Sequence, residues 1–253
     1  MWGMPMKYQI TFLLPLLLMS LSMFAAEGKQ VTYSSGNDRV QGMLYTPSEK
    51  GPFPAIIVIH EWWGLNDWVK EQASKLADQG YVALAVDLYR GKVATSPDEA
   101  HEIMRGVPED RAKQDLNAAF TYLKSQNNVT GDRIGAIGWC MGGGYSLDVA
   151  LQEPTLAADV INYGHLAVDQ SSLKKINAPI LGIFGGKDRG IPVEDVRKFQ
   201  QTMQQLGKKI EIVIYPDAGH AFENPNNKEQ YRAQDAQDAW KHITEFLQAN
   251  LKK

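Results

Sequence analysis

The chain has 253 residues, a formal net charge of −3 and an ordinary globular composition, with 44% hydrophobic and 22% charged residues. A chain of this size buries a large core and needs neither disulfides nor metals for its stability. The near balance of 26 basic and 29 acidic residues excludes the strong positive charge typical of nucleic-acid-binding domains. The composition favours a protein that acts on a small molecule, without identifying that molecule.

The first 26 residues have the pattern of a secretory signal peptide. Lys7 precedes an apolar stretch at 10–21, and small residues stand before Glu27. This stretch is too short to span a bilayer comfortably. We expect cleavage to leave residues 27–253 as a periplasmic or secreted protein without stable membrane contact. An uncleaved N-terminal anchor is the alternative, because the residues before Glu27 are not small at both positions that the cleavage pattern requires.

Downstream of this leader, strand-like apolar stretches alternate with stretches of helical periodicity. In the first half we expect strands at 31–34, 40–45, 54–60 and 81–86, a helix capped by Asn66 that ends near Ala77, and helices at 96–104 and 109–125. In the second half we expect strands at 133–139, 158–163, 180–184 and 210–215, a helix from about Met141, and helices at 192–206 and 228–251. The alternation predicts one α/β domain with a mostly parallel sheet covered by helices on both faces. Active residues in such sheets gather at the carboxyl ends of the strands.

The single cysteine of the chain stands between a predicted strand and a predicted helix, in the segment Gly138-Trp139-Cys140-Met141-Gly142. This is the G-x-S-x-G nucleophile elbow with cysteine in place of serine. The glycines are required because the turn is sharp and the residues two before and two after the nucleophile lie close together. The N-terminus of the following helix favours the thiolate. The alternative is a glycine-rich turn that holds an inert cysteine, and we favour the catalytic interpretation.

A nucleophile of this kind needs a base and a group that orients the base, and in α/β-hydrolases the chain order is nucleophile, acid, histidine. His220 has the required order and lies in a loop just past the strand at 210–215. His165, after the strand at 158–163, is a weaker rival. The other histidines either precede Cys140 or fall within predicted helices, namely His60, His101 and His242.

The acid is expected between the nucleophile and the histidine. Asp188 follows the strand at 180–184 and would hold the tautomer of His220 and stabilise its imidazolium form. Asp217 is the alternative, although it stands only three residues before His220 and would have difficulty reaching the far imidazole nitrogen.

The loop after the first buried strand reads His60-Glu61-Trp62-Trp63-Gly64. A loop in this position supplies one backbone N–H to the oxyanion hole, and the residue after the nucleophile supplies the other. We therefore expect the N–H groups of Trp62 and Met141 to bind the oxyanion. The tryptophans are either ordinary core residues or part of the wall of the substrate pocket.

Taken together, five segments resemble the dienelactone hydrolase family over roughly residues 31–251: Val58-Ile59-His60-Glu61-Trp62-Trp63-Gly64, Asp87-Leu88-Tyr89, Gly138-Trp139-Cys140-Met141-Gly142-Gly143, Gly186-Lys187-Asp188 and Ala218-Gly219-His220-Ala221-Phe222. The resemblance implies a single-domain α/β-hydrolase fold and a triad of Cys140, His220 and Asp188. It also implies an acyl-enzyme formed from a lactone or activated ester. A further implication is that Glu61 interacts with the nucleophile at rest and releases it when substrate binds.

Two departures from the family bear on the substrate. Well-known members hold a substrate carboxylate with two arginines, and those positions are occupied here by Gly91 and Asn224, while an arginine, Arg90, directly follows Tyr89. Dienelactone itself is therefore in doubt as the substrate. We expect the substrate contacts to be Trp63, Tyr89, Arg90 and Phe222.

The sequence thus predicts a thiol-dependent hydrolase of a small ester or lactone. One alternative is a promiscuous carboxylesterase of larger apolar esters, which the two tryptophans would suit. Another is a non-hydrolytic, redox-responsive or ligand-binding relative that uses Cys140. No metal cluster, phosphate loop or dinucleotide fingerprint occurs, so we expect no cofactor. We expect a monomer that binds a small molecule and no nucleic acid.

Overall fold

The computed structural model describes Met1, Gly3 and residues 26–166 and 169–252. Nearly all of the predicted signal peptide, residues 1–26, lies outside the described residues. The strands are β1 (Gly28–Ser35), β2 (Asp38–Tyr45), β3 (Phe53–Ile59), β4 (Val82–Val86), β5 (Val129–Trp139), β6 (Ala158–Asn162), β7 (Ile180–Gly185) and β8 (Ile210–Tyr215). The helices are α1 (Asp67–Asp78), α2 (Pro97–Arg105), α3 (Glu109–Lys124), α4 (Met141–Gln152), α5 (Gln170–Leu173), α6 (Val193–Gln205) and α7 (Ala233–Leu251).

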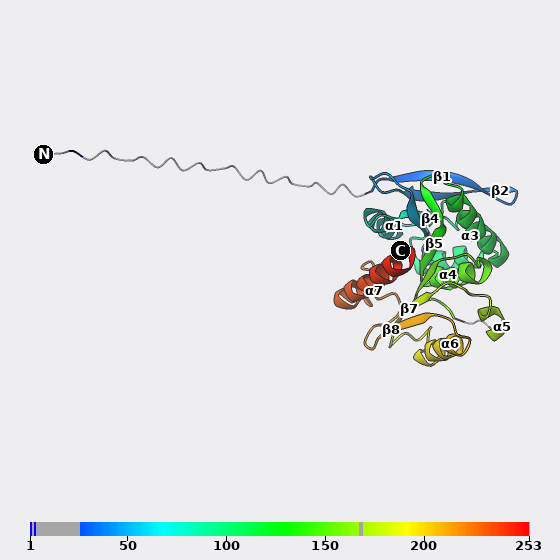
Figure 1. Ribbon diagram of the computed structural model, residues 1–253. Coiled ribbons are helices and arrows are strands. Elements are labelled where there is room, and N and C mark those ends of the chain that lie inside the picture. Colours follow the sequence, from blue (N-terminus) through cyan, green and yellow to red (C-terminus); the bar gives the residue numbers. More distant parts are fainter. Residues whose placement is uncertain (2, 4–25, 167–168, 253) are drawn as a thin grey trace.

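The eight strands form one sheet in the order β1-β2-β4-β3-β5-β6-β7-β8. The pairs β1–β2 and β2–β4 are antiparallel, and the remaining pairs are parallel. A parallel pair requires a crossover, and helices supply most of these crossovers, as Figure 1 shows. The predicted mostly parallel α/β architecture is therefore confirmed.

Both faces of the sheet are apolar, and the alternation of side chains along a strand divides the core into two layers. On β3, Ile57 and Ile59 pack into the layer covered by α3, α4 and α6, whereas Ile56 and Val58 pack into the layer covered by α1 and α7. All four side chains are fully buried. Because β3 is buried on both faces, its side chains are apolar at consecutive positions, and this continuous apolar run is the pattern that predicted the strand.

Several element ends differ from the predictions for local reasons. Strand β5 begins at Val129, four residues earlier than expected, because Phe53 of β3 pairs with Val129 across a register shift. Helix α7 begins at Ala233 instead of residue 228, since residues 228–230 form a turn and residues 231–232 have no regular structure. The short helix α5, capped by Asp169, was not predicted.

The described helices include none that is both long and apolar enough to cross a membrane.

Candidate active site

Cys140 occupies a sharp turn between β5 and α4. Its backbone has φ 55° and ψ −118°, a strained conformation for a residue with a side chain. A Cβ on Gly138 would lie 2.0 Å from the carbonyl oxygen of Gly142, and a Cβ on Gly142 would lie 2.4 Å from that of Ile59. Only glycine fits at these two positions, so the turn that presents Cys140 depends on them.

Three side chains from three loops form a hydrogen-bonded row. The Nε2 atom of His220 lies 3.0 Å from the Sγ atom of Cys140, and its Nδ1 atom lies 2.6 Å from Oδ2 of Asp188. The second oxygen of Asp188 accepts hydrogen bonds from the backbone N–H groups of Gly190 and Ile191, at 2.8 and 3.1 Å. The structure therefore brings together the predicted nucleophile, base and acid, and it fixes the carboxylate at both oxygens.

The electrostatics of the row favour a charged imidazole. Burial alone lowers the pKa of His220, but hydrogen bonds to Asp188 and Cys140 outweigh it and raise the pKa to about 10. For Asp188 burial acts in the opposite direction and raises the pKa. The contacts with His220 and with the two loop N–H groups outweigh burial, so the pKa of Asp188 lies below its ordinary value. The site therefore favours imidazolium beside carboxylate, which is the state that pairs with a thiolate nucleophile.

The rival acid, Asp217, lies outside this row. Its carboxylate is exposed and forms an ion pair with Lys187 at 2.7 Å. Asp217 therefore has no contact with the imidazole, and Asp188 is the residue that the geometry favours as the orienting acid.

The two predicted oxyanion donors are the backbone N–H groups of Trp62 and Met141. Within the described part of the chain neither N–H group has a hydrogen-bond acceptor, so both are free to bind substrate. The hydroxyl of Tyr89 lies 3.0 Å from the carbonyl oxygen of Trp62 and 3.3 Å from the sulfur of Met141. Tyr89 thus contacts both segments from which the donors come.

Glu61 is fully buried beside the row and does not contact the thiol in this structure. Its Oε2 atom accepts a 2.6 Å hydrogen bond from Asn224, the residue that occupies one of the family's arginine positions. Burial raises the pKa of Glu61 to about 7, against the lowering effects of Asn224 and His220. The side chain of Cys140 faces His220 here, and the expected contact between Glu61 and the thiol is not among the hydrogen bonds of either side chain.

A second buried acid, Glu223, was not predicted. Its Oε2 atom accepts a hydrogen bond from Nε1 of Trp139 at 3.2 Å, and its Oε1 atom has no hydrogen-bond partner among the described residues. Burial raises the pKa of Glu223 to about 8; the bond from Trp139 opposes this rise, and the charge of Glu61 adds to it. No signal in the sequence distinguishes this glutamate from an ordinary loop residue.

The raised pKa of Glu223 predicts a pH-dependent cost to stability. The pKa of Glu223 in the folded protein, about 8, exceeds the ordinary value of 4.5, so the unfolded chain loses this proton first as pH rises. The free energy of unfolding therefore falls as pH rises from about 4.5 to about 8. The variant Glu223→Gln keeps an acceptor for Trp139 and carries no charge. We expect its Tm to match the parent at about pH 5 and to exceed it by several degrees at about pH 9. A difference in Tm that does not change with pH would contradict this assignment.

The row of Cys140, His220 and Asp188 opens into a pocket of about 1330 Å³. One wall is apolar and combines Trp62 and Trp63 with residues of the segment that leads into and includes α2, namely Val93, Ala94 and Met104. The ring of His101, on α2, packs edge-on against Trp62 at 4.7 Å between ring centroids. The opposite side carries Cys140, Asp188 and His220 together with polar residues of the loop 224–230.

Three of the four predicted substrate contacts do not line this pocket. Arg90 points to α3 instead, where it pairs with Asp115 at 2.7 Å, because its backbone adopts a positive φ of 56°. Phe222 is fully buried and packs against Tyr163 and Tyr215. Tyr89 is buried, and its hydroxyl is occupied by the contacts with Trp62 and Met141. Trp63 alone lies where it was predicted.

The remaining histidines do not join the row. His60 is fully buried and bonded to backbone groups, and His165 is exposed on the loop after β6. Residues 26–166 and 169–252 contain no group of three or more His, Cys, Asp or Glu side chains that could hold a metal ion.

A mostly parallel sheet with a nucleophile elbow after β5, an acid after β7 and a histidine after β8 defines an α/β-hydrolase. The sequence profile of the dienelactone hydrolase family matches residues 40–251, and the chain belongs to that family. Members of the family are hydrolases that act on carboxylic ester bonds, and this chain is an enzyme of that class.

Individual relatives agree with this assignment. A protein of Methylorubrum extorquens named "Putative carboxymethylenebutenolidase" is 36% identical over 79% of this chain and 74% of its own length. A protein of the same name from Escherichia coli K12 is 34% identical over 78% of this chain and 77% of its own. The crystal structure titled "Putative Dienelactone Hydrolase" from Klebsiella pneumoniae superposes with a TM-score of 0.80 at 26% identity, and covers 88% of this chain and 99% of the other.

Proposed function

We propose that this enzyme hydrolyses a small ester or lactone through a thiol ester on Cys140. The observation that carries the proposal is the hydrogen-bonded row of Cys140, His220 and Asp188, which lines a large pocket. A protein that only binds a ligand needs no such row. Membership of the dienelactone hydrolase family supports a small-molecule substrate, and action as a monomer stays our expectation.

The geometry supports a two-step reaction. The thiolate of Cys140 attacks the carbonyl carbon, and the oxyanion that develops accepts hydrogen bonds from the N–H groups of Trp62 and Met141. When the carbon–oxygen bond of the leaving group breaks, the imidazolium of His220 donates its proton to the alkoxide. Neutral His220 then takes a proton from a water molecule that attacks the thiol ester, and the acid product leaves as the thiolate and imidazolium form again.

Two substrate classes are compatible with this site. The names of the relatives support a lactone, whereas the size of the pocket and the wall of Trp62, Trp63 and Met104 support a larger apolar ester. A pocket of about 1330 Å³ exceeds the usual range for small ligands. We favour the small ester or lactone. Comparison of dienelactone with p-nitrophenyl esters of increasing chain length distinguishes the two, since a rise of kcat/KM with chain length supports the second class.

Alkylation of the single cysteine tests the proposal. We expect one equivalent of iodoacetamide per chain to abolish hydrolysis of p-nitrophenyl acetate, and substrate to slow the alkylation, because Cys140 is the only thiol. Mass spectrometry gives the stoichiometry, and the release of p-nitrophenol gives the activity. Full alkylation with activity retained would overturn the thiol mechanism. Rapid alkylation of a protein that turns over no ester would support the redox or binding alternative.

We also propose that the protein is exported and that residues 1–26 are a cleaved signal peptide. The charge of Lys7 followed by the apolar stretch at 10–21 supports this. N-terminal sequencing of the protein from the periplasmic fraction is expected to begin near Glu27. A full-length chain in the membrane fraction would support an uncleaved anchor instead.

A further inference from the structure

We propose that His60 is a positioning residue, which aims the N–H group of Trp62 at the oxyanion through the peptide bond between Glu61 and Trp62. This proposal rests on the hydrolytic function proposed above and assigns a role to a histidine outside the triad. It accounts for the Asp87-Leu88-Tyr89 motif as well, because that segment holds His60 and Trp62 in place.

The two nitrogens of the buried His60 ring have different backbone partners. The backbone N–H of Leu88 donates to Nε2 at 3.2 Å, and Nδ1 lies 2.6 Å from the carbonyl oxygen of Glu61. A backbone N–H only donates, so Nε2 must accept and the single ring proton must be on Nδ1. Burial lowers the pKa of His60, which keeps the ring neutral and consistent with this tautomer. His60 therefore donates to the carbonyl of Glu61.

The carbonyl that His60 holds belongs to the peptide bond whose other end is the N–H of Trp62. The same oxygen also accepts from the N–H of Gly64 at 3.2 Å, so two donors fix its direction. In a planar trans peptide the C=O and N–H bonds point in opposite directions. Fixing the carbonyl toward His60 and Gly64 therefore turns the N–H of Trp62 away from them. The first turn of α4 packs directly on this segment, because a Cβ added to Gly142 would lie only 2.6 Å from the carbonyl oxygen of His60.

The hydrogen bond has an electronic effect in addition to the geometric one. A donor on the carbonyl polarises the amide and strengthens the hydrogen bond that its N–H donates, because hydrogen bonds in series polarise one another. His60 thus orients the donor to the oxyanion and increases its strength without touching the substrate.

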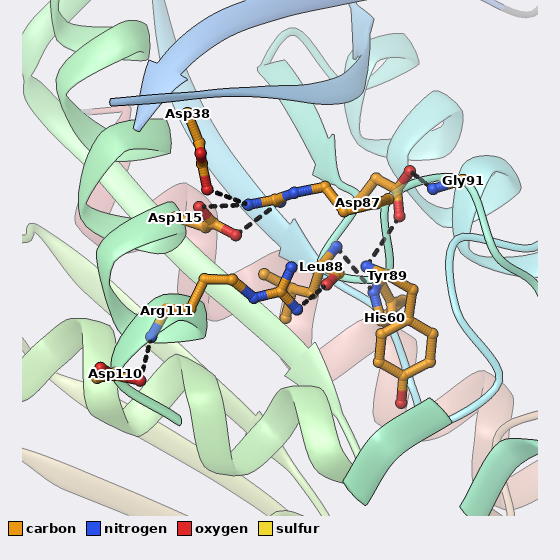
Figure 2. Close-up of polar contacts among 10 residues, drawn as sticks. Asp38, His60, Asp87, Leu88, Tyr89, Gly91, Asp110, Arg111 and Asp115 are labelled. Atoms are coloured by element: carbon orange, nitrogen blue, oxygen red, sulfur yellow. Dashed lines mark hydrogen bonds and ion pairs between the residues drawn. The ribbon is translucent and has the colours of Figure 1, made fainter. Parts of the chain in front are cut away.

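The loop that holds His60 is itself fixed by polar contacts, as Figure 2 shows. The carboxylate of Asp87 accepts from the N–H groups of Tyr89 at 3.0 Å and Gly91 at 2.5 Å. Arg111 of α3 donates to the carbonyl of Leu88 at 3.0 Å. Arg90 pairs with Asp115 of α3 and lies 3.9 Å from Asp38. These contacts fix the loop at 87–91, and a residue that orients an oxyanion donor needs such fixed surroundings.

The loop at 87–91 also contacts the turn at 61–64, which carries the N–H of Trp62, at a second point. The hydroxyl of Tyr89 donates to the carbonyl of Trp62, one peptide further along the chain from the bond that His60 makes. The ring of Tyr89 packs edge-on against the ring of His60, with centroids 4.7 Å apart. The two side chains therefore fix consecutive peptides of the same turn.

Two substitutions of His60 separate its two hydrogen bonds. In His60→Asn the side-chain amide places a donor near the position of Nδ1 and keeps the bond to Glu61. In His60→Gln the amide oxygen reaches the position of Nε2 and keeps the bond from Leu88, but the donor to Glu61 is lost. We expect His60→Gln to lower kcat for p-nitrophenyl acetate by about tenfold or more with little change in KM, and His60→Asn to retain most of kcat.

The rate of alkylation of Cys140 by iodoacetamide is the control for both variants. This reaction forms a sulfur–carbon bond and expels iodide at a saturated carbon, so no oxyanion develops and the N–H of Trp62 contributes nothing. We expect the alkylation rate to stay within about twofold of the parent in both variants. Tyr89→Phe provides a further variant: it removes only a hydroxyl, and we expect a severalfold loss of kcat with the alkylation rate again unchanged.

The outcomes are distinct from those that test the thiol mechanism. Equal losses of kcat in His60→Asn and His60→Gln, with alkylation slowed in parallel, would assign His60 a merely structural role and overturn the proposal. Unchanged kcat in His60→Gln and Tyr89→Phe would overturn it as well. Neither result would affect the assignment of Cys140, which is tested separately by whether hydrolysis persists after the thiol is blocked. If both His60 variants fail to fold, Tyr89→Phe alone decides.

Discussion

Cys140→Ala is expected to lower kcat for p-nitrophenyl acetate by about 10⁴-fold or more, to the rate that binding and the oxyanion donors alone provide. The physical reason is that, in the proposed mechanism, the thiolate of Cys140 is the group that forms the acyl-enzyme. The measurement is the steady-state release of p-nitrophenol at saturating substrate. Alanine fits the elbow because it keeps the Cβ and removes only the sulfur, so the Tm should change little.

The companion variant His220→Ala gives the comparison that shows whether the residues act as a unit. His220 contacts both the thiol of Cys140 and the carboxylate of Asp188, at 3.0 and 2.6 Å. We expect it to lose about as much activity as Cys140→Ala, and the double variant to be no worse than either, because groups that act in one step are not additive. Additive losses, or a Cys140→Ala variant that keeps substantial turnover, would contradict the triad.

Asp188→Asn is expected to lower kcat by about 10³-fold or more while the fold stays intact. The amide would present either a donor or a neutral acceptor to Nδ1 of His220, and neither stabilises the imidazolium as the carboxylate does. The pKa of His220, raised to about 10 in the parent, would fall, and with it the population of the charged pair at neutral pH. The pH dependence of kcat/KM and the Tm together measure this effect.

Asp217→Asn is the matched control for that variant. Both aspartates lie in loops that border the site, but Asp217 is exposed and bonded to Lys187, whereas the side chain of Asp188 is 1% exposed and bonded to His220. We expect Asp217→Asn to keep kcat within about twofold, because an exposed ion pair contributes little. A larger loss in Asp217→Asn than in Asp188→Asn would move the role of the acid to Asp217.

The features that the sequence predicts well are those whose physical cause is local. The continuous apolar run of β3 requires a strand buried on both faces, and Asn66 caps α1 with its side chain as expected. The elbow at Cys140 can be predicted from the sequence because only glycine fits at positions 138 and 142. The chain order of nucleophile, acid and histidine then selects Asp188 and His220, which the structure brings beside Cys140 in one row.

The features that it predicts poorly depend on contacts between distant segments. Arg90 stands beside the site in the chain, yet its positive φ turns the side chain toward Asp115, and no local pattern reveals this. Phe222 and Glu223 stand two and three residues after His220, yet both are buried, beyond a residue with positive φ, Ala221. Met104 lines the pocket from α2, which only the tertiary arrangement brings near Trp62.

The pairing of Glu61 with Asn224 illustrates the same limit. The sequence shows that Asn224 occupies an arginine position of the family, but it does not show what the asparagine does. In the structure its amide bonds to the buried carboxyl of Glu61 at 2.6 Å. The amide of Asn224 is thus a neutral partner for an acid whose pKa burial raises to about 7.

The most direct test of the account is the mass of the enzyme quenched in acid during turnover of p-nitrophenyl acetate. We predict one acetyl group per chain, located by peptide mapping on Cys140, that disappears as substrate is exhausted and is absent from Cys140→Ala. Sustained turnover with no acyl adduct on the parent enzyme, or an adduct on another residue, would contradict a thiol-ester mechanism at this site.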